Sequence, residues 1–548
     1  MAVGSALIPG RTGTAAPPPP KGARTLGVVF VAVLVAVTLI AGFLRIWLAF
    51  HSALDADEAI VGLLAQGIRH GHFSAFYWGQ HYGGVEPYSV AAMFGVFGQA
   101  PAVLVLTASV LALVTSLVVW RIGLRLFSPG AAMTAAVLAW IWPEVALWNS
   151  TREYGFHQIG VLLGMVVFLG ALRIVDDPPP RPGGPRDWVL CGVAAGLGWW
   201  ATPEVLYMAL PAAYLLVAGL RGRRLVDIGP RVLLGAVAFV VGALPWIYVS
   251  VKTHFGTLVF VTEPVAHNTY GRRLTTFFSH VAPLMLGTRI EGAGAWEGPA
   301  LFAIVSTLVV VALVIGAAVV LAVSVPKARF LVIFVVTFPF LYAAFPSNWF
   351  WNDGRYGIWL TPVLALVLCG ALWHVVSERM ARFIATCALI LALASTLVAF
   401  NAGYGALSSP SRLTSWSANP NATIDDLASD LETHGVVDVY AGYWVAYELT
   451  YLSGGQVEVM ALQNDRNPAD DRVVEDAPSA GWLFVHPGRL DTLAEQLGTS
   501  QFLQSSTITE AQFESWLAAH HIPFHVTQVG DFDLVQPARN VRPSMLAT

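Results

Sequence analysis

The chain is short of charged residues. Only 12% of its 548 residues are charged, against ~25% in a typical soluble domain, while 56% are hydrophobic. Its 30 Lys and Arg are outnumbered by 34 Asp and Glu, which gives a formal net charge of −4. This balance excludes the strongly basic surface that a nucleic-acid-binding protein needs, so we expect no nucleic-acid partner.

Cysteine is scarce too, and no cleavable signal peptide is recognisable. Cys191, Cys369 and Cys387 all lie in apolar runs, where they form neither a disulfide framework nor a zinc-binding spacing. Residues 1–24 are rich in Pro, Gly and Ala and are typical of a disordered tail. The apolar run that follows is too long for the core of a signal peptide and lacks a small-residue cleavage site. We therefore expect residues 1–24 to be a cytoplasmic tail.

Long apolar runs dominate the first 400 residues. Runs of roughly 18 residues or more recur there, long enough to cross the ~30 Å hydrocarbon core of a membrane. Hydropathy predicts about eleven spans, at residues 25–50, 101–120, 131–148, 158–175, 188–202, 204–220, 231–250, 299–323, 330–346, 357–376 and 383–402. The fifth and sixth are short and also fit one broken hairpin. We predict a polytopic α-helical membrane protein.

The basic residues predict the orientation. If the N-terminus is cytoplasmic, the short inside loops hold most of the clustered basic residues, as the positive-inside rule requires. These are Arg121 with Arg125, Arg181 with Arg186, Arg221 with Arg223 and Arg224, Lys327 with Arg329, and Arg379 with Arg382. We therefore expect a multi-pass protein of the plasma or inner membrane with its C-terminus outside.

Three outside segments are long. The first loop covers about 51–100 and another covers 252–298, both within a transmembrane domain of residues 25–402. The tail, 403–548, is richer in Asp and Glu and alternates between helical and strand patterns. Helices are predicted at 425–434 and 490–497, strands at 436–443, 457–462 and 482–486, and a hairpin at 524–535. We predict a small extracytoplasmic α/β domain.

The first outside loop contains most of the candidate catalytic residues. Asp55, Asp57 and Glu58 follow the first span directly, and Glu86 lies where the chain re-enters the membrane. Many aromatic and small residues separate these acids, which suits a sugar-sized pocket. A carboxylate near the bilayer surface is also the usual general base for an attacking hydroxyl. The alternative is a solvated loop that only marks the end of a span.

The order of these residues resembles a known family. Asp57-Glu58 after the first span, a Gly-x-x-Tyr stretch ending at Tyr82, and then Glu86-Pro87 is similar to the first-loop signature of the GT-C superfamily. Its closest kin are the dolichyl-phosphate-mannose protein mannosyltransferases and the lipid A aminoarabinose transferases. The resemblance covers about residues 25–400 in span order and loop placement. It implies an inverting glycosyltransferase with a polyprenyl-phosphate-sugar donor.

The resemblance assigns roles residue by residue. Asp57 matches the catalytic or acceptor-binding aspartate, Glu58 its neighbour and Glu86 the second acid, while Asp55 is a weaker candidate for the role of Asp57. The aminoarabinose group has a Lys after the second glutamate and an Arg two residues after Asp-Glu. This chain has Pro87 and Ile60 there, so the donor phosphate must be held differently in detail.

A phosphate requires a cation, and Arg355 is the best candidate. Arg355-Tyr356 precedes an apolar span that contains Pro362, which resembles the Arg-Tyr-x-x-x-x-Pro feature near the lipid-phosphate site of the superfamily. The guanidinium fork donates two hydrogen bonds to phosphate oxygens. The alternative is an Arg that anchors the end of a span at the interface.

Two further outside segments offer pocket residues. Arg152, Tyr154 and His157 follow the third span, where they either line the pocket or form part of an aromatic belt. The loop 252–298 holds His254, Glu263, His267 and His280. A divalent metal bound by Glu86 and one of these histidines is left open, although the spacing shows no ligand pattern.

The predicted partners are the bilayer, the lipid-linked sugar and a glycan, lipid or protein acceptor. The main alternative is a transporter or flippase of lipid-linked sugars, which should have charged or broken segments at mid-membrane depth in both halves. A non-catalytic scaffold or sensor is a third reading, but it would not need acids and aromatics crowded into the first loop. The acids at loop edges favour the enzyme.

Overall fold

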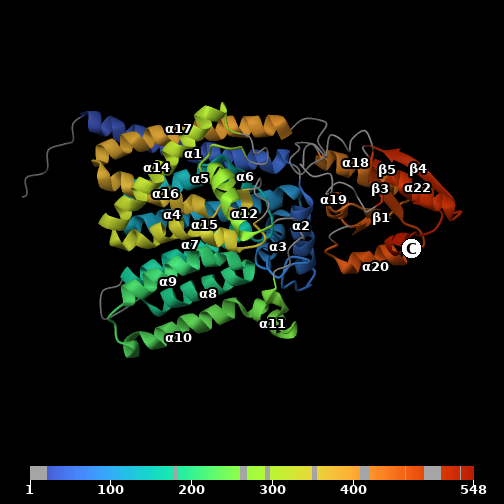
Figure 1. The fold of residues 1–548 in the computed structure, drawn as a ribbon, viewed down its shortest axis with the longest axis horizontal. Coiled ribbons are helices and arrows are strands. Elements are labelled where there is room, and N and C mark those ends of the chain that lie inside the picture. The colour runs from blue at the N-terminus through green and yellow to red at the C-terminus, as the bar shows by residue number, and fades with distance from the viewer. Residues whose placement is uncertain are drawn as a thin grey trace, which may run out of the picture.

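The computed structural model describes residues 21–547 except 53, 177–182, 260–267, 291–295, 349–353, 408–419, 463–464, 487–507 and 531. Long helices lie side by side along the length of the molecule, and a small sheet lies beyond one end of them (Figure 1). Two short helices, α2 (Ala56–Arg69) and α3 (Glu86–Phe97), lie between the long helices and the sheet.

The bundle contains a helix at the place of each predicted span. These helices are α1 (Lys21–His51), α4 (Pro101–Leu126), α5 (Pro129–Ile141), α7 (His157–Asp176), α8 (Pro185–Ala201), α9 (Leu206–Leu220), α10 (Leu225–Gly242), α14 (Ala300–Ser324), α15 (Arg329–Ala344), α16 (Leu360–Val375) and α17 (Glu378–Leu407). Prolines stand in the first turn of α4, α5 and α8, where a missing N–H costs nothing.

The polytopic helical fold is confirmed. In the part of the chain that the structure describes, seven helices are long and apolar enough to cross a membrane, and an eighth span is added if α10 and α11 (Leu244–Lys252), bent by 64°, count as one. The shorter apolar helices α5 and α16 pack among them. The count of eleven spans stays a prediction.

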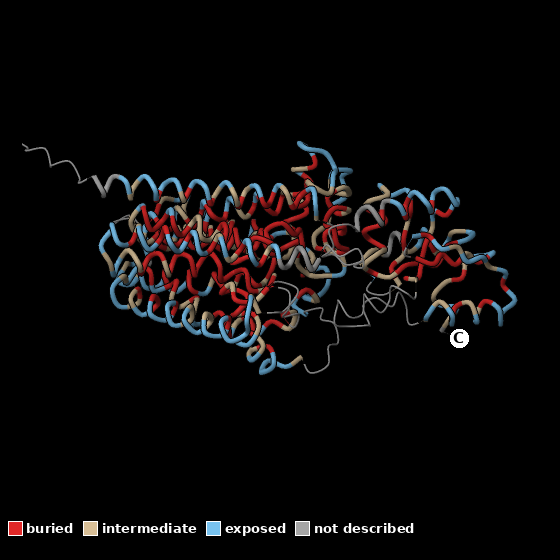
Figure 2. Tube along the Cα trace, turned by 90° about the horizontal axis from the view of Figure 1, so that it is seen from above, coloured by how far each residue is buried: buried red, intermediate tan, exposed pale blue. Residues whose placement is uncertain are grey.

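The outside of the bundle is apolar. Figure 2 shows that the outward faces of the long helices are exposed while their inward faces are buried. On α14, Leu301, Phe302 and Leu308 are 76%, 68% and 64% exposed. A soluble monomer rarely exposes such a continuous apolar surface, whereas lipid chains solvate it well.

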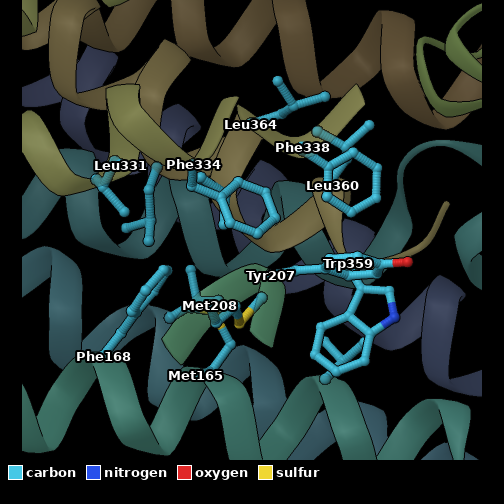
Figure 3. Packing of buried hydrophobic residues seen from close by; sticks show 14 of the residues in the cluster. Met165, Phe168, Tyr207, Met208, Leu331, Phe334, Phe338, Trp359, Leu360 and Leu364 are labelled. Carbon is cyan, nitrogen blue, oxygen red and sulfur yellow. The ribbon is translucent and has the colours of Figure 1, made fainter. Parts of the chain in front are cut away.

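The inside of the bundle is closely packed. Phe168 of α7 stacks edge-on against Phe330 and Phe334 of α15, with ring centroids 4.9 and 6.1 Å apart. Tyr207 of α9 meets Trp359, just before α16, at 5.5 Å (Figure 3). These rings join four helices into one core, so the loops at the bundle end start from fixed positions.

The sheet region confirms the predicted C-terminal fold. Its strands β1 (Asp438–Ala441), β2 (Glu458–Ala461), β3 (Gly481–Val485), β4 (Phe524–Val529) and β5 (Phe532–Pro537) are ordered β2-β1-β3-β5-β4. The first three pair in parallel, and β5 pairs antiparallel with β3 and β4. The predicted hairpin is β4–β5, with Gly530 at a φ of +59° in its turn. The predicted helix 490–497 lies outside the described residues.

In the part of the C-terminal region that the structure describes, four helices accompany the sheet, and three of them were not predicted. The expected helix at 425–434 is α18 (Pro420–Thr433), whereas α19 (Tyr443–Leu452), α20 (Pro468–Asp476) and α22 (Glu510–Ala519) are additions. Helix α19 packs against α2 of the first loop, so the sheet region contacts the bundle end directly.

The two ends of the bundle differ in their charges. At the end away from the sheet, Asp176 accepts from Arg125 at 3.1 Å and from Lys327 at 2.6 Å. Arg173 pairs with Asp187 at 2.7 Å nearby. These residues belong to loops and helix ends that the basic residues assigned to one side of the membrane, and the acids of the first loop gather at the other end.

The contact between α2 and α19 generates a stability prediction. A Cβ at Gly62 would lie 2.5 Å from the ring of buried Tyr451, whereas a Cβ at Gly95 of α3 would meet open space. Gly62→Ala is therefore expected to destabilise the protein by about 1–3 kcal/mol through overpacking, and Gly95→Ala is not. Apparent Tm in detergent measures this. Equal Tm values for the two variants would contradict the packing.

Candidate active site

Helix α2 starts with a capping box that fixes its first turn. The Asp55 carboxylate accepts from the Glu58 N–H at 2.9 Å, and the Asp55 N–H donates to the Glu58 carboxylate at 3.1 Å. Asp55 is only 1% exposed, so the structure places it as a helix cap. Asp57, between the two, projects from the helix N-terminus, where the helix dipole favours an anion.

Asp57 is held by three side chains from distant parts of the chain. Its Oδ2 accepts from Arg355 at 3.0 Å. Its Oδ1 accepts from the Tyr443 hydroxyl at 2.6 Å and from the Tyr77 hydroxyl at 3.2 Å. The side chain of Asp57 is still 21% exposed, so the carboxylate is fixed in direction and open to a ligand.

These partners keep Asp57 ionised. Burial would raise its pKa, but Arg355, the hydrogen bond from Tyr443 and the charge of Arg466 outweigh burial, and the net pKa is lowered. A carboxylate of this kind is anionic at neutral pH. It accepts a proton only from a group that is itself becoming acidic, such as a hydroxyl whose oxygen is forming a new bond.

Arg355 is positioned by an aromatic ring. It lies in the short turn Gly354–Tyr356 that precedes α16, and its guanidinium carbon is 3.8 Å from the centroid of the Tyr154 ring. The sequence placed Arg355, Tyr154 and Asp57 in three separate segments, and the structure brings them together. Arg355 is 12% exposed, so its charge is largely shielded from water and strong in its effect.

Glu58 and Arg152 form a buried ion pair. Their oxygen and nitrogen are 2.9 Å apart, and the side chains are 0% and 1% exposed. The other Glu58 oxygen accepts from the backbone N–H of Glu153 at 3.1 Å. Arg152 also lies over the Trp148 ring at 4.5 Å. Both residues are therefore used to join the first loop to the segment 148–153 and do not face the open side of Asp57.

Glu86 meets another carboxyl that the sequence analysis did not select. Fully buried at the start of α3, Glu86 interacts electrostatically with the side chain of Glu153 and accepts from the Ile159 N–H at 3.4 Å. Burial raises the pKa of Glu86 to about 7. Burial, with the adjacent Glu86, raises the pKa of Glu153 well above its ordinary value. Two buried carboxyls this close share a proton.

The remaining predicted pocket residues lie deeper. The His157 ring is 5.0 Å from the Tyr356 ring, and its Nδ1 is 4.0 Å from a Glu204 oxygen. Tyr82 packs edge-on against Phe156 at 4.7 Å. Within the described residues, no hydrogen bond joins either of these side chains to Asp57, whereas such bonds join Tyr77 and Tyr443 to it.

Three residues at the site were missed from the sequence. Tyr77, Tyr443 and Arg466 were not among the predicted site residues. Tyr443 was predicted to end a strand, but it begins α19; the i, i+4 spacing of Tyr443, Tyr447 and Tyr451 is the local signal that indicates a helix face there. Nothing local showed that this face points at Asp57, since the two residues are 386 positions apart.

A metal site finds little support in the described residues. No group of three His, Cys, Asp or Glu side chains there is arranged to hold an ion. Glu86 lies beside Glu153 rather than a histidine. His280 shares a hydrogen bond with Ser279 at 2.7 Å, and Glu263 and His267 lie outside the described residues.

Residues 85–248, from the start of α3 into α11, match the family model of the dolichyl-phosphate-mannose-protein mannosyltransferases. No curated protein sequence matches the chain.

Solved structures are similar over most of the chain. ArnT from Cupriavidus metallidurans bound to undecaprenyl phosphate is 12% identical with a TM-score of 0.59, over 93% of this chain and 98% of that one. Its apo form gives the same identity and TM-score over 94% and 98%. The Archaeoglobus fulgidus oligosaccharyltransferase in complex with Zn and sulfate is 13% identical with a TM-score of 0.50, over 93% and 73%.

The Glu86–Glu153 pair generates a pH prediction. The pKa of Glu86 is raised from 4.5 to about 7 in the folded protein, so the folded state holds a proton that the unfolded chain releases. The contribution of Glu86 to stability is thus fully present below pH 4.5 and is lost as pH rises to about 7. Glu153→Gln removes one charge, and its amide can donate to Glu86. We expect a smaller fall in apparent Tm between about pH 5 and pH 8.

The matched control is Glu432→Gln, because Glu432 is exposed on α18. It should keep the wild-type dependence of Tm on pH. If Glu153→Gln showed that same dependence, the two carboxyls would not be sharing a proton.

Proposed function

We propose, because the chain has the GT-C glycosyltransferase fold that its sequence resembled, that it is an inverting glycosyltransferase. It moves one sugar from a polyprenyl-phosphate donor to an acceptor hydroxyl at the outer face of the plasma or inner membrane. The observation that carries this proposal is the pairing of an ionised, partly open Asp57 with Arg355 at one end of an apolar bundle. A base and a phosphate-binding cation there meet a lipid-linked donor at the membrane edge.

The similar structures support the class of donor. The Cupriavidus protein of the same fold was crystallised with undecaprenyl phosphate. The apolar sides of the bundle provide a path along which a polyprenyl tail lies in the bilayer while its phosphate reaches Arg355. Arg355 lies at the end of the bundle with Tyr356 and Tyr154 around it, which suits a headgroup at the interface.

The reaction needs one base and one leaving-group site. The acceptor hydroxyl oxygen attacks the anomeric carbon and forms the new glycosidic bond, while the bond from that carbon to the phosphate oxygen breaks. The hydroxyl proton passes to Asp57, and the bonding electron pair leaves with the polyprenyl phosphate, which becomes a dianion. Arg355 stabilises the charge gained by the phosphate. Attack opposite the leaving group inverts the anomeric centre.

Other predicted residues act by holding this geometry. Glu58 with Arg152 and Glu86 with Glu153 join α2 and α3 to the segment 150–157, so we assign them positioning roles. Tyr82, Tyr154 and His157 line the sugar pocket. No step is assigned to a metal ion, because the described carboxyls at the site are engaged with arginines, tyrosines or each other.

The orientation follows from the same reasoning. The bundle end with Asp57 carries the sheet region, and the opposite end carries the ion pairs of Asp176 with basic residues. We propose that the N-terminus is cytoplasmic and that the sheet region is an extracytoplasmic domain. The acceptor then approaches from outside.

Asp57→Asn tests the base. We expect sugar transfer from radiolabelled polyprenyl-phosphate sugars to membrane extract to fall by about 10²- to 10⁴-fold, because an amide cannot accept the proton. The control Asp430→Asn alters an exposed acid of α18 and should transfer at the wild-type rate.

Apparent Tm and gel filtration establish that both variants fold. Normal transfer by folded Asp57→Asn would remove Asp57 from the mechanism. Lipid translocation by a wild type that transfers no sugar from any donor would favour the flippase.

A further inference from the structure

We propose that the C-terminal sheet region completes the active site, and that its Arg466 is a second cation for the phosphate of the lipid-linked donor. This rests on the proposed function and adds a binding residue outside the transmembrane bundle. Tyr443 of the same region acts with it as a positioning residue for Asp57.

Arg466 is held firmly between the sheet region and the first loop. Its backbone N–H donates to the Tyr447 hydroxyl at 2.6 Å, and its Nη1 donates to the Trp78 carbonyl at 3.4 Å. Asp465 accepts from the Asn467 N–H at 3.0 Å, which closes the turn around Arg466. Such a turn presents the side chain in one direction.

The first loop leaves room for the Arg466 side chain. Gly79, at a φ of +70°, lies against it, and a Cβ there would be 2.9 Å from the Arg466 Cδ. The positive φ and the missing side chain make glycine the residue that fits this position. The approach of Arg466 is therefore built into both segments.

The Arg466 charge is directed at the site. Its guanidinium carbon is 5.6 and 5.9 Å from the ring centroids of Tyr443 and Tyr77, the two tyrosines that donate to Asp57. Arg466 and Arg355 both act electrostatically on Asp57 and on Tyr82. The Arg466 Nε is buried and has no hydrogen-bond partner among the described residues.

The ionised side chains around Asp57, counted with Asp57 itself, have a net charge of one positive unit. Asp57 is one anion between Arg355 and Arg466, whereas Glu58 and Arg152 neutralise each other. The nearby carboxyls of Asp55 and Glu448 have pKa values raised mainly by burial, which favours their neutral forms. An excess positive charge in a partly buried site is the expected complement of a phosphate.

The excess positive charge matters most when the leaving group departs, because the negative charge on the phosphate increases at that step. The donor is a phosphodiester with one negative charge, and the departing polyprenyl phosphate has two. A second cation therefore stabilises the transition state more than the bound donor, which raises the rate of transfer.

The test compares binding of two lipids to the full-length protein in detergent. Wild type should bind a polyprenyl phosphate more tightly than the neutral polyprenol of the same chain length. Arg466→Gln should lower this preference by about tenfold, the effect of one charge-assisted contact. Arg472→Gln, an exposed arginine of α20, is the matched control and should keep the wild-type preference.

The ratio of the two affinities separates charge recognition from structural damage. Loosening of the fold would weaken both lipids together and leave the ratio unchanged. Arg466→Lys keeps the charge but loses the fork, so its ratio should lie between those of wild type and Arg466→Gln. Hydrogen exchange of α19 shows directly whether the sheet region stays docked.

Three results would overturn the proposal. An unchanged ratio in Arg466→Gln would reduce Arg466 to a docking contact and leave the proposed function intact. Binding of a water-soluble phosphomonoester is measured as well. If Arg466→Gln weakened binding of that compound but not of polyprenyl phosphate, Arg466 would be assigned to an anionic acceptor instead of the donor. A wild type without preference for the phosphorylated lipid would count against the donor class itself, and so against the proposed function as well.

Discussion

The buried ion pair of Glu58 and Arg152 fixes the position of the first loop, and the rest of the site is built around that loop. It is removed from water, and it closes the gap between the first loop and the segment after α6 (Glu144–Asn149). Removing one partner of such a pair typically costs about 3–5 kcal/mol, since the other charge is left buried. The same Glu58 caps α2 together with Asp55, so helix start and loop contact are fixed by one side chain.

Asp57 gains its properties from this arrangement. Its neighbours in sequence, Asp55 and Glu58, point inward to cap the helix, and only Asp57 remains partly open. The acidic cluster Asp55, Asp57 and Glu58 is thereby divided into two buried members and one partly open member. The lowered pKa of Asp57 comes from Arg355, Tyr443 and Arg466 overcoming burial, and all three are contributed by segments far along the chain.

The fold tolerates extensive sequence change for a physical reason. Lipid-facing positions require only an apolar side chain, so helices such as α14 retain their function while their residues change freely. Identity of 12% across almost the full length of ArnT from Cupriavidus metallidurans is consistent with that freedom. The charged groups at the bundle end are more constrained physically, because desolvation makes each buried charge costly unless it is paired.

The sequence alone determined the helical membrane architecture, because apolar runs long enough to cross a bilayer have few other stable forms. It also selected Asp57 and Arg355 as site candidates, and the structure brings their side chains within 3.0 Å of each other. It did not separate Asp57 from Glu58, find Glu153 beside Glu86, or bring Tyr443 and Arg466 to the site. Those contacts join segments up to 386 positions apart, and hydrophobic periodicity contains no information about which distant segments meet. Only the packing of α19 on α2 decided that the sheet region faces Asp57.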